Sequence, residues 1–155
     1  MKRNQNLIEL SKDHHHGLLL GWKIKQGFKY EVAADEVRKY ILHFAEEALF
    51  PHFDEEEQQV LVHLSADNEY HKRTLAEHLE IKDLLQVIRL QDVVDQALLL
   101  VFANKLEAHI RFEERELFPY LEATLSGEQL DEIGELISSV HQSYVENYPH
   151  EFWLR

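Results

Sequence analysis

Residues 93–125 of the chain read VVDQALLLVFANKLEAHIRFEERELFPYLEATL, a segment long enough to predict one extended helix. Its apolar residues recur three and four positions apart, which is the spacing of one face of an α-helix. Asp92 stands directly before the segment, where an acidic side chain can cap the first turn. Pro119 lies near its end and lacks a backbone donor. The segment therefore favours an all-α fold.

The same spacing and capping signals predict helices before and after this segment. The expected ranges are residues 11–28, 35–64, 69–90 and, as a short extra C-terminal helix, about 126–147. Ser11 is the expected cap of the first helix, Ser126 and Gln129 form a capping box, and Pro51 is expected to break or kink the second helix. Three apolar residues before the first helix should form a short arm: Leu7, Ile8 and Leu10. Short loops between long helices predict an up-down-up-down four-helix bundle.

The composition limits the class of protein. With 155 residues, 45% hydrophobic and 29% charged, the chain fits one domain over residues 1–155, with its core at 7–125. Five Gly and three Pro are too few for the turns of a β-sandwich or barrel. The formal net charge of −13 disfavours nucleic-acid and membrane-surface partners. No stretch is apolar enough for a membrane span, so we expect a cytoplasmic protein.

Any metal site in this chain must use nitrogen and oxygen ligands, because the sequence contains no cysteine. It contains 11 His and 29 Asp and Glu, and imidazole with carboxylate is the ligand set of non-haem iron, manganese and zinc. Four histidines have an acidic residue four positions later, on the same helix face: His43/Glu47, His52/Glu56, His63/Asp67 and His109/Glu113. Solvated ion pairs have the same spacing, so this pattern alone does not define a site.

The height of each histidine in the bundle is a stronger criterion, because ligands from different helices must meet at one level. At 1.5 Å per residue, His52 and His78 differ by about 5 Å, and His78 and His109 by about 6 Å. His15 in the first helix reaches the same level. Apolar residues share the helix faces of His52, His78 and His109, which predicts burial. His43 lies about 17 Å off this level among charged residues, so we expect it to be solvated.

Glu56 and Glu113 each lie one turn beyond a histidine, on two helices that run parallel in this topology. Both carboxylates can therefore reach one point between the helices. Two carboxylates held close in an apolar bundle repel each other unless cations lie between them. A pair of bridged metal ions meets this requirement, as in bundle di-iron sites. His141 and His150 lie beyond the four-helix unit, and we expect them on the surface.

Four segments carry a resemblance to a known family: SKDHHHGL at 11–18, HFDEEE at 52–57, EH at 77–78 and HIRFEERELFP at 109–119. They resemble the bacterial hemerythrin-like family, also called HHE cation-binding domains, over residues 7–125. The resemblance implies a four-helix bundle with two non-haem iron ions, histidine terminal ligands and two bridging carboxylates, able to bind O2 or NO. Zinc or manganese also suits the same ligand set.

Carried over by motif, the implied metal ligands are His14 or His15, His52, Glu56, His78, His109 and Glu113. The first-helix ligand stays open between His14 and His15, because adjacent helical residues point about 100° apart. Small residues beside His14, including Gly17, leave room for a bound ligand. The resemblance departs from the invertebrate oxygen carriers, whose pattern has two histidines four residues apart on the third helix. Here Thr74 and Lys82 stand four residues before and after His78, so one histidine is missing.

Three functions are compatible with these residues. The favoured one is a di-iron protein that binds or senses O2 or NO, or handles iron, and that does not turn over an organic substrate. The second is a di-iron oxidase or peroxidase, although ferritin-like sites use Glu-x-x-His and more carboxylates. The third is a metal-free helical interaction module whose histidines are core or surface residues.

Overall fold

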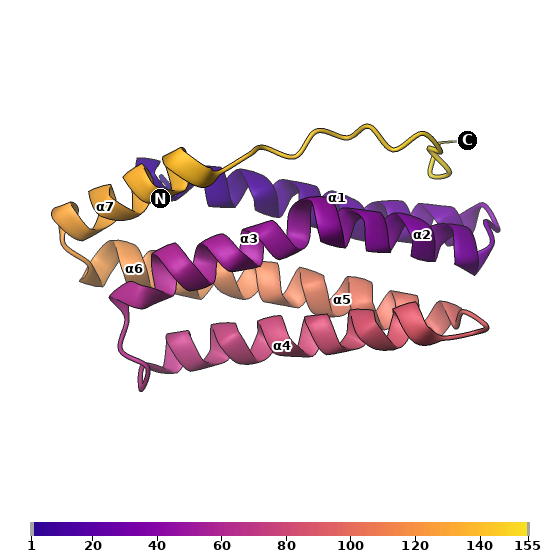
Figure 1. The fold of residues 1–155 in the computed structure, drawn as a ribbon, viewed down its shortest axis with the longest axis horizontal. Coiled ribbons are helices and arrows are strands. Elements are labelled where there is room, and N and C mark those ends of the chain that lie inside the picture. The colour runs from indigo at the N-terminus through magenta and orange to yellow at the C-terminus, as the bar shows by residue number, and fades with distance from the viewer. Residues whose placement is uncertain (1, 155) are drawn as a thin grey trace.

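The computed structural model describes residues 2–154, and within them the chain is all-helical, with no strand. The elements are α1 (Ile8–Lys29), α2 (Ala34–Phe44), α3 (Phe50–Glu55), α4 (Glu69–Leu90), α5 (Gln96–Phe112), α6 (Phe118–Thr124) and α7 (Gly127–Val140). Figure 1 shows α1, α2 with α3, α4, and α5 with α6 as four antiparallel runs, with α7 beside the N-terminal end. The predicted all-α, up-down-up-down bundle is confirmed. Each described helix is too short or too polar to span a lipid bilayer.

Two of the four runs contain π-helical turns, in which an N–H group donates to the carbonyl five residues earlier. They cover Ala45–Leu49 and Glu56–Val60 in the second run and Glu113–Leu117 in the fourth. Two of these turns end just before Pro51 and Pro119. The wider turn accommodates a residue that has no N–H to donate. The second run is therefore continuous through Pro51 and ends in a 3-10 turn at Leu61–His63.

The first helix begins earlier than the sequence predicts. A 3-10 turn at Gln5–Leu7 precedes α1, and the Asn4 side chain caps it by accepting from the N–H of Asn6. The predicted cap, Ser11, lies inside α1 and donates instead to the Glu114 carboxylate at 2.8 Å. The expected arm is therefore part of the helical run, because a better cap lies upstream of it.

Of the three later helix starts with a predicted cap, those of α4 and α7 agree with the sequence and that of α5 does not. Asn68 caps α4 at its predicted start, and Ser126 with Gln129 forms the predicted capping box of α7. Asp95 caps α5 in place of Asp92, since its side chain accepts from the N–H of the second helical residue at 2.9 Å. Residues 91–95 therefore belong to the loop.

The predicted C-terminal helix at 126–147 is too long, because α7 ends at Val140. The chain after it is extended and runs back along the bundle toward the α1–α2 connection (yellow in Figure 1). Its aromatic side chains join the core, and Tyr148 and Trp153 both have ring centroids 4.9 Å from that of Tyr40 in α2. These contacts favour the extended conformation over the helix that the sequence of the segment predicts.

Buried Lys23 of α1 ties this C-terminal segment to the bundle. Its ammonium donates to the Glu146 carboxylate at 2.7 Å and to the Tyr40 hydroxyl at 3.0 Å. The Trp153 ring centroid lies 4.2 Å from the same nitrogen. Only 7% of the Lys23 side chain is exposed, so its charge depends on Glu146 for compensation.

The apolar core consists of two clusters with a polar layer between them. The larger cluster contains Phe53 and Phe102, and the smaller contains Leu10 and Phe118. On three of the runs, residues of the larger cluster lie toward one end and residues of the smaller cluster toward the other. On α4 the larger cluster takes the C-terminal part, and partly buried Tyr70 packs against the smaller cluster. The buried histidines and glutamates fall between them, whereas buried Lys23 lies within the larger cluster.

Replacing Glu146 by alanine should lower the free energy of unfolding by about 2 kcal/mol, because it leaves the buried Lys23 charge without its partner. Urea unfolding measures this change. Glu36→Ala is the matched control, since Glu36 pairs with exposed His150 at 3.1 Å and should change stability by less than about 0.5 kcal/mol. Equal effects of the two variants would contradict the structural role of Lys23.

Candidate metal centre

Six predicted site residues meet in the polar layer of the bundle. They are His14 of α1, His52 of α3, His78 of α4, His109 of α5, and Glu56 and Glu113 at the first positions of two π-helical turns. All six are buried, and neither glutamate has any exposed surface. Their role as ligands stays a prediction, but the structure brings them together at one level.

The alternative first-helix ligand, His15, does not join this group. His15 is exposed on α1, and its neighbours on that side, Leu18 and Trp22, are also exposed. The turn of about 100° between adjacent residues directs His14 inward instead. The structure therefore favours His14 over His15.

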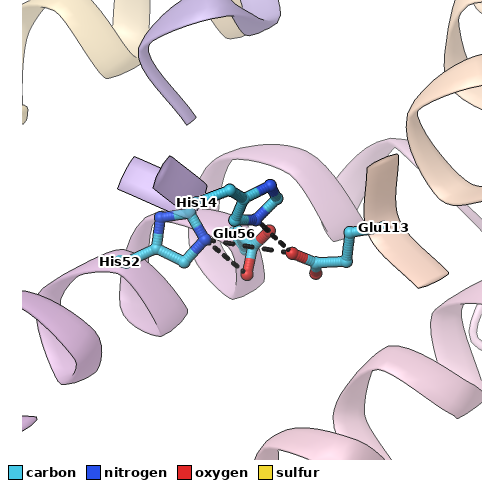
Figure 2. A group of neighbouring side chains, drawn as sticks. All are labelled: His14, His52, Glu56 and Glu113. Carbon is cyan, nitrogen blue, oxygen red and sulfur yellow. Dashed lines mark hydrogen bonds and ion pairs between the residues drawn. The ribbon is translucent and has the colours of Figure 1, made fainter. Parts of the chain in front are cut away.

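One half of the centre is formed by His14, His52 and the two glutamates (Figure 2). Nε2 of His14 lies 2.8 Å from Oε1 of Glu113 and 4.0 Å from Oε2 of Glu56. Nε2 of His52 lies 3.3 Å from Oε1 of Glu56 and 3.9 Å from Oε1 of Glu113. Each imidazole thus faces both carboxylates.

The other half is formed by His78, His109 and the same two glutamates. Nε2 of His78 lies 3.1 Å from Oε1 of Glu56 and 3.9 Å from Oε2 of Glu113. Nε2 of His109 lies 3.3 Å from Oε2 of Glu113. Because both halves share Glu56 and Glu113, the arrangement is consistent with a di-metal site.

A second carboxylate orients each of the four imidazoles. Nδ1 of His52 donates to Asp13 at 2.8 Å, and Nδ1 of His78 donates to Glu57 at 2.7 Å. Nδ1 of His109 donates to Glu77 at 2.7 Å, and Nδ1 of His14 donates to Glu114 at 2.6 Å. With the proton on Nδ1, the Nε2 lone pair is free to bind a cation. Histidine ligands of metals are typically held by such outer carboxylates.

The sequence patterns did not identify these four outer carboxylates. Each one is the immediate chain neighbour of a predicted ligand but serves a histidine on another run. Asp13, beside His14, holds His52, for example. The signal was present as acid–ligand dipeptides, but the partner on the other helix is visible only in three dimensions.

Several polar atoms of the centre are buried without a hydrogen-bond partner. They are Nε2 of His52, Nε2 of His109, Oε2 of Glu56 and Oε2 of Glu113. An unsatisfied buried polar atom costs about 1–3 kcal/mol, so four in one layer require an explanation. All four atoms face the space between the imidazoles and the glutamates. The donor set of nitrogen and oxygen therefore fits a pair of first-row divalent ions.

Ion pairing shifts the titration of the metal-free centre. Burial opposes protonation of His109, but the nearby charge of Glu113 outweighs it and raises the pKa of His109 to about 10. Burial also favours the neutral form of Glu113, but His109 and its neighbours lower the pKa of Glu113 well below its ordinary value. In the same way the glutamates raise the pKa of His14 and His52. Protonation of these imidazoles therefore competes with metal binding.

Thr74 occupies the position where a further histidine would complete the oxygen-carrier pattern. It is fully buried, and its hydroxyl donates to the carbonyl of Tyr70 at 2.7 Å. This hydroxyl is turned back to its own helix, so the centre offers four histidines and two shared carboxylates.

A small apolar cavity adjoins the centre. Its volume is about 20 Å³, and its lining includes Gly17, Leu49, His52, Leu106 and Ile110. A molecule the size of water needs roughly 10–15 Å³, so the cavity can hold one small molecule. Gly17 is necessary for this space, because a Cβ atom there would lie 2.6 Å from Cδ1 of Ile110.

Comparison with known families finds one match, and comparisons with curated proteins and with solved structures find none. The match is to the hemerythrin HHE cation-binding domain and covers residues 6–121, which include all six residues of the centre. The buried His and Glu cluster is consistent with a di-metal site. The chain therefore belongs to the hemerythrin HHE cation-binding domain family.

Proposed function

We propose that the chain is a non-haem di-iron protein that binds or senses a diatomic gas, O2 or NO. The observation that carries the proposal is the pair of fully buried glutamates, each faced by imidazole nitrogens whose other ring nitrogen is fixed by an outer carboxylate. Iron in this cage would supply the electrons and the open coordination position that such a gas requires.

The protein's own residues would limit what reaches the metal pair. Thr74 closes the position of a fifth histidine without offering a ligand, which leaves the coordination of the pair incomplete. The apolar cavity beside His52 and His109 provides a space for a small uncharged molecule at the centre. Phe53, which also lines this cavity, stacks on His78, and Phe118 stacks on His14, so apolar rings cover two of the imidazoles.

The two alternative functions are less well supported. Ferritin-like oxidase sites use Glu-x-x-His motifs and more carboxylates, whereas this centre has four histidines and two shared glutamates. A metal-free interaction module gives no reason for four unpartnered polar atoms in one buried layer.

The choice of the first-helix ligand gives a matched test. Chain loaded anaerobically with Fe²⁺ should retain about two tightly held ions after desalting. At a hundredfold excess over Kd, each ion should add about 2.7 kcal/mol to the free energy of unfolding. His14→Leu should lose most of this iron and the stabilisation, whereas His15→Leu should retain both. Elemental analysis and urea unfolding measure the two effects. Iron binding unaffected by His14→Leu would contradict the proposal.

Gas binding can be tested by filling the cavity. Gly17→Ala places a methyl group against Ile110 and should slow NO association with the reduced iron-loaded chain by about tenfold, the effect of a barrier about 1.4 kcal/mol higher. Stopped-flow absorption measures this rate. Gly21→Ala on the same helix meets no atom within 4 Å and should leave the rate unchanged. Equal rates in all three chains, with iron retained, would argue against this cavity as the gas site.

Metal uptake should release protons, because the pKa values of His14, His52 and His109 are raised in the metal-free chain. Metal needs the deprotonated Nε2 atoms, so affinity should rise with pH and continue rising above neutrality, toward the pKa of about 10 of His109. Calorimetric titration with Zn²⁺ in buffers of different ionisation enthalpy measures the protons released. Affinity independent of pH would contradict this account.

A further inference from the structure

One histidine outside the centre is buried although the sequence predicts it on the surface. His141 follows α7, and only 6% of its side chain is exposed, because it packs between α1 and α3. Its surroundings are acidic, with Glu9 and Asp13 on α1 and Glu55 on α3 in ion-pair contact. His150, by contrast, is exposed as predicted.

His141 repeats the arrangement of the four histidines of the centre. Its Nδ1 donates to Oε1 of Glu55 at 2.7 Å, as the other imidazoles donate to their outer carboxylates. Its Nε2 is buried without a hydrogen-bond partner. That atom lies 3.4 Å from Oδ1 of Asp13 and 3.7 Å from Oε2 of Glu9. A carboxylate-oriented imidazole thus directs its free nitrogen at two further carboxylates.

We propose that His141, Asp13 and Glu55, whose donor atoms all lie within 4.8 Å of one another, form a third divalent-cation site, with Glu9 beside it on the solvent side. We call these four residues the outer site; of the four outer carboxylates around the di-metal centre, it includes only Asp13. Imidazole with two carboxylates suits Fe²⁺, Mn²⁺ or Zn²⁺ rather than Ca²⁺ or Mg²⁺, which prefer all-oxygen sites. Glu9 is 41% exposed, so water can complete the coordination and the ion can exchange with solvent.

The charge of the outer site favours a cation. Its three carboxylates contact two imidazoles, those of His141 and His52. Among the residues that the structure describes, Lys12 is the only lysine or arginine in contact with them, 3.3 Å from Glu9. Two of the three, Asp13 and Glu55, are mostly buried, with 15% and 11% of their side chains exposed. Nearby positive charge is needed to hold buried carboxylates in their charged form.

Asp13 connects the outer site to the di-metal centre. Its Oδ2 accepts from Nδ1 of His52 at 2.8 Å, while its Oδ1 faces His141. An ion at the outer site would share this carboxylate with a ligand of the buried pair. The two sites are therefore adjacent, but substitutions of His141 or Glu9 change only the outer site, because these two residues contact no residue of the buried pair.

Titration of the whole metal-free chain with Co²⁺, followed by its visible absorption and by equilibrium dialysis, tests the outer site. Wild type should bind about three ions, the third more weakly because its site is open to solvent. His141→Gln should bind about two. Glu9→Gln, an exposed change that does not threaten folding, should weaken the third ion by about tenfold, and Glu55→Ala should weaken it by about 10–100-fold.

His150→Gln is the matched control, since His150 is a C-terminal histidine paired with a single glutamate, and it should retain three ions. Two ions in wild type and no loss in His141→Gln would overturn the outer site while leaving the buried pair intact. One weak ion that His141→Gln abolishes would instead support the outer site and contradict the di-iron proposal. Lower stability of His141→Gln at an unchanged ion count would show a purely structural ion pair.

Discussion

The negative charge of two fully buried carboxylates is the constraint on which the structure depends. Glu56 and Glu113 have no exposed surface and face each other between four helical runs, so positive charge must be supplied within the bundle. Four imidazoles supply it through protons or direct their lone pairs to cations that do. On each run, one outer carboxylate accepts a hydrogen bond from a histidine of another run, so the four together form a ring around the bundle. They are Asp13, Glu57, Glu77 and Glu114. This ring fixes the angular position of every run.

The two central carboxylates, Glu56 and Glu113, each stand at the start of a π-helical turn, whose first carbonyl accepts from the N–H five residues later. A π-helical turn adds a residue to the helix and changes the direction of the side chains that follow. Pro119 helps to specify one turn, because it lacks an N–H, but no proline follows the turn at Glu56. Spacing at 3.6 residues per turn could predict the helices but not these local departures.

The sequence predicted the helices and the level of the histidines because both follow from rise per residue and apolar spacing. It failed where a distant contact decides the outcome, as in the C-terminal segment. Residues 141–154 would reach only about 20 Å as a helix but about 45 Å when extended, and only the longer reach brings Trp153 to Tyr40. Pro149 also disfavours a helical conformation at Tyr148. The burial of His141 has the same origin, because His141 stands at the start of this extended segment.

The polar layer also decides how the two halves of the core are joined. On α1 the smaller cluster contributes Leu10 and the larger Leu20, with His14 between them, and α5 repeats the pattern around His109. Apolar packing therefore stabilises each half separately, while contact across the layer depends on charges and hydrogen bonds. Such contacts lose strength when a partner is missing, because the remaining buried groups have no water to solvate them. Two metal ions held by all four runs would thus stabilise the weakest layer of the core, which links metal binding to folding.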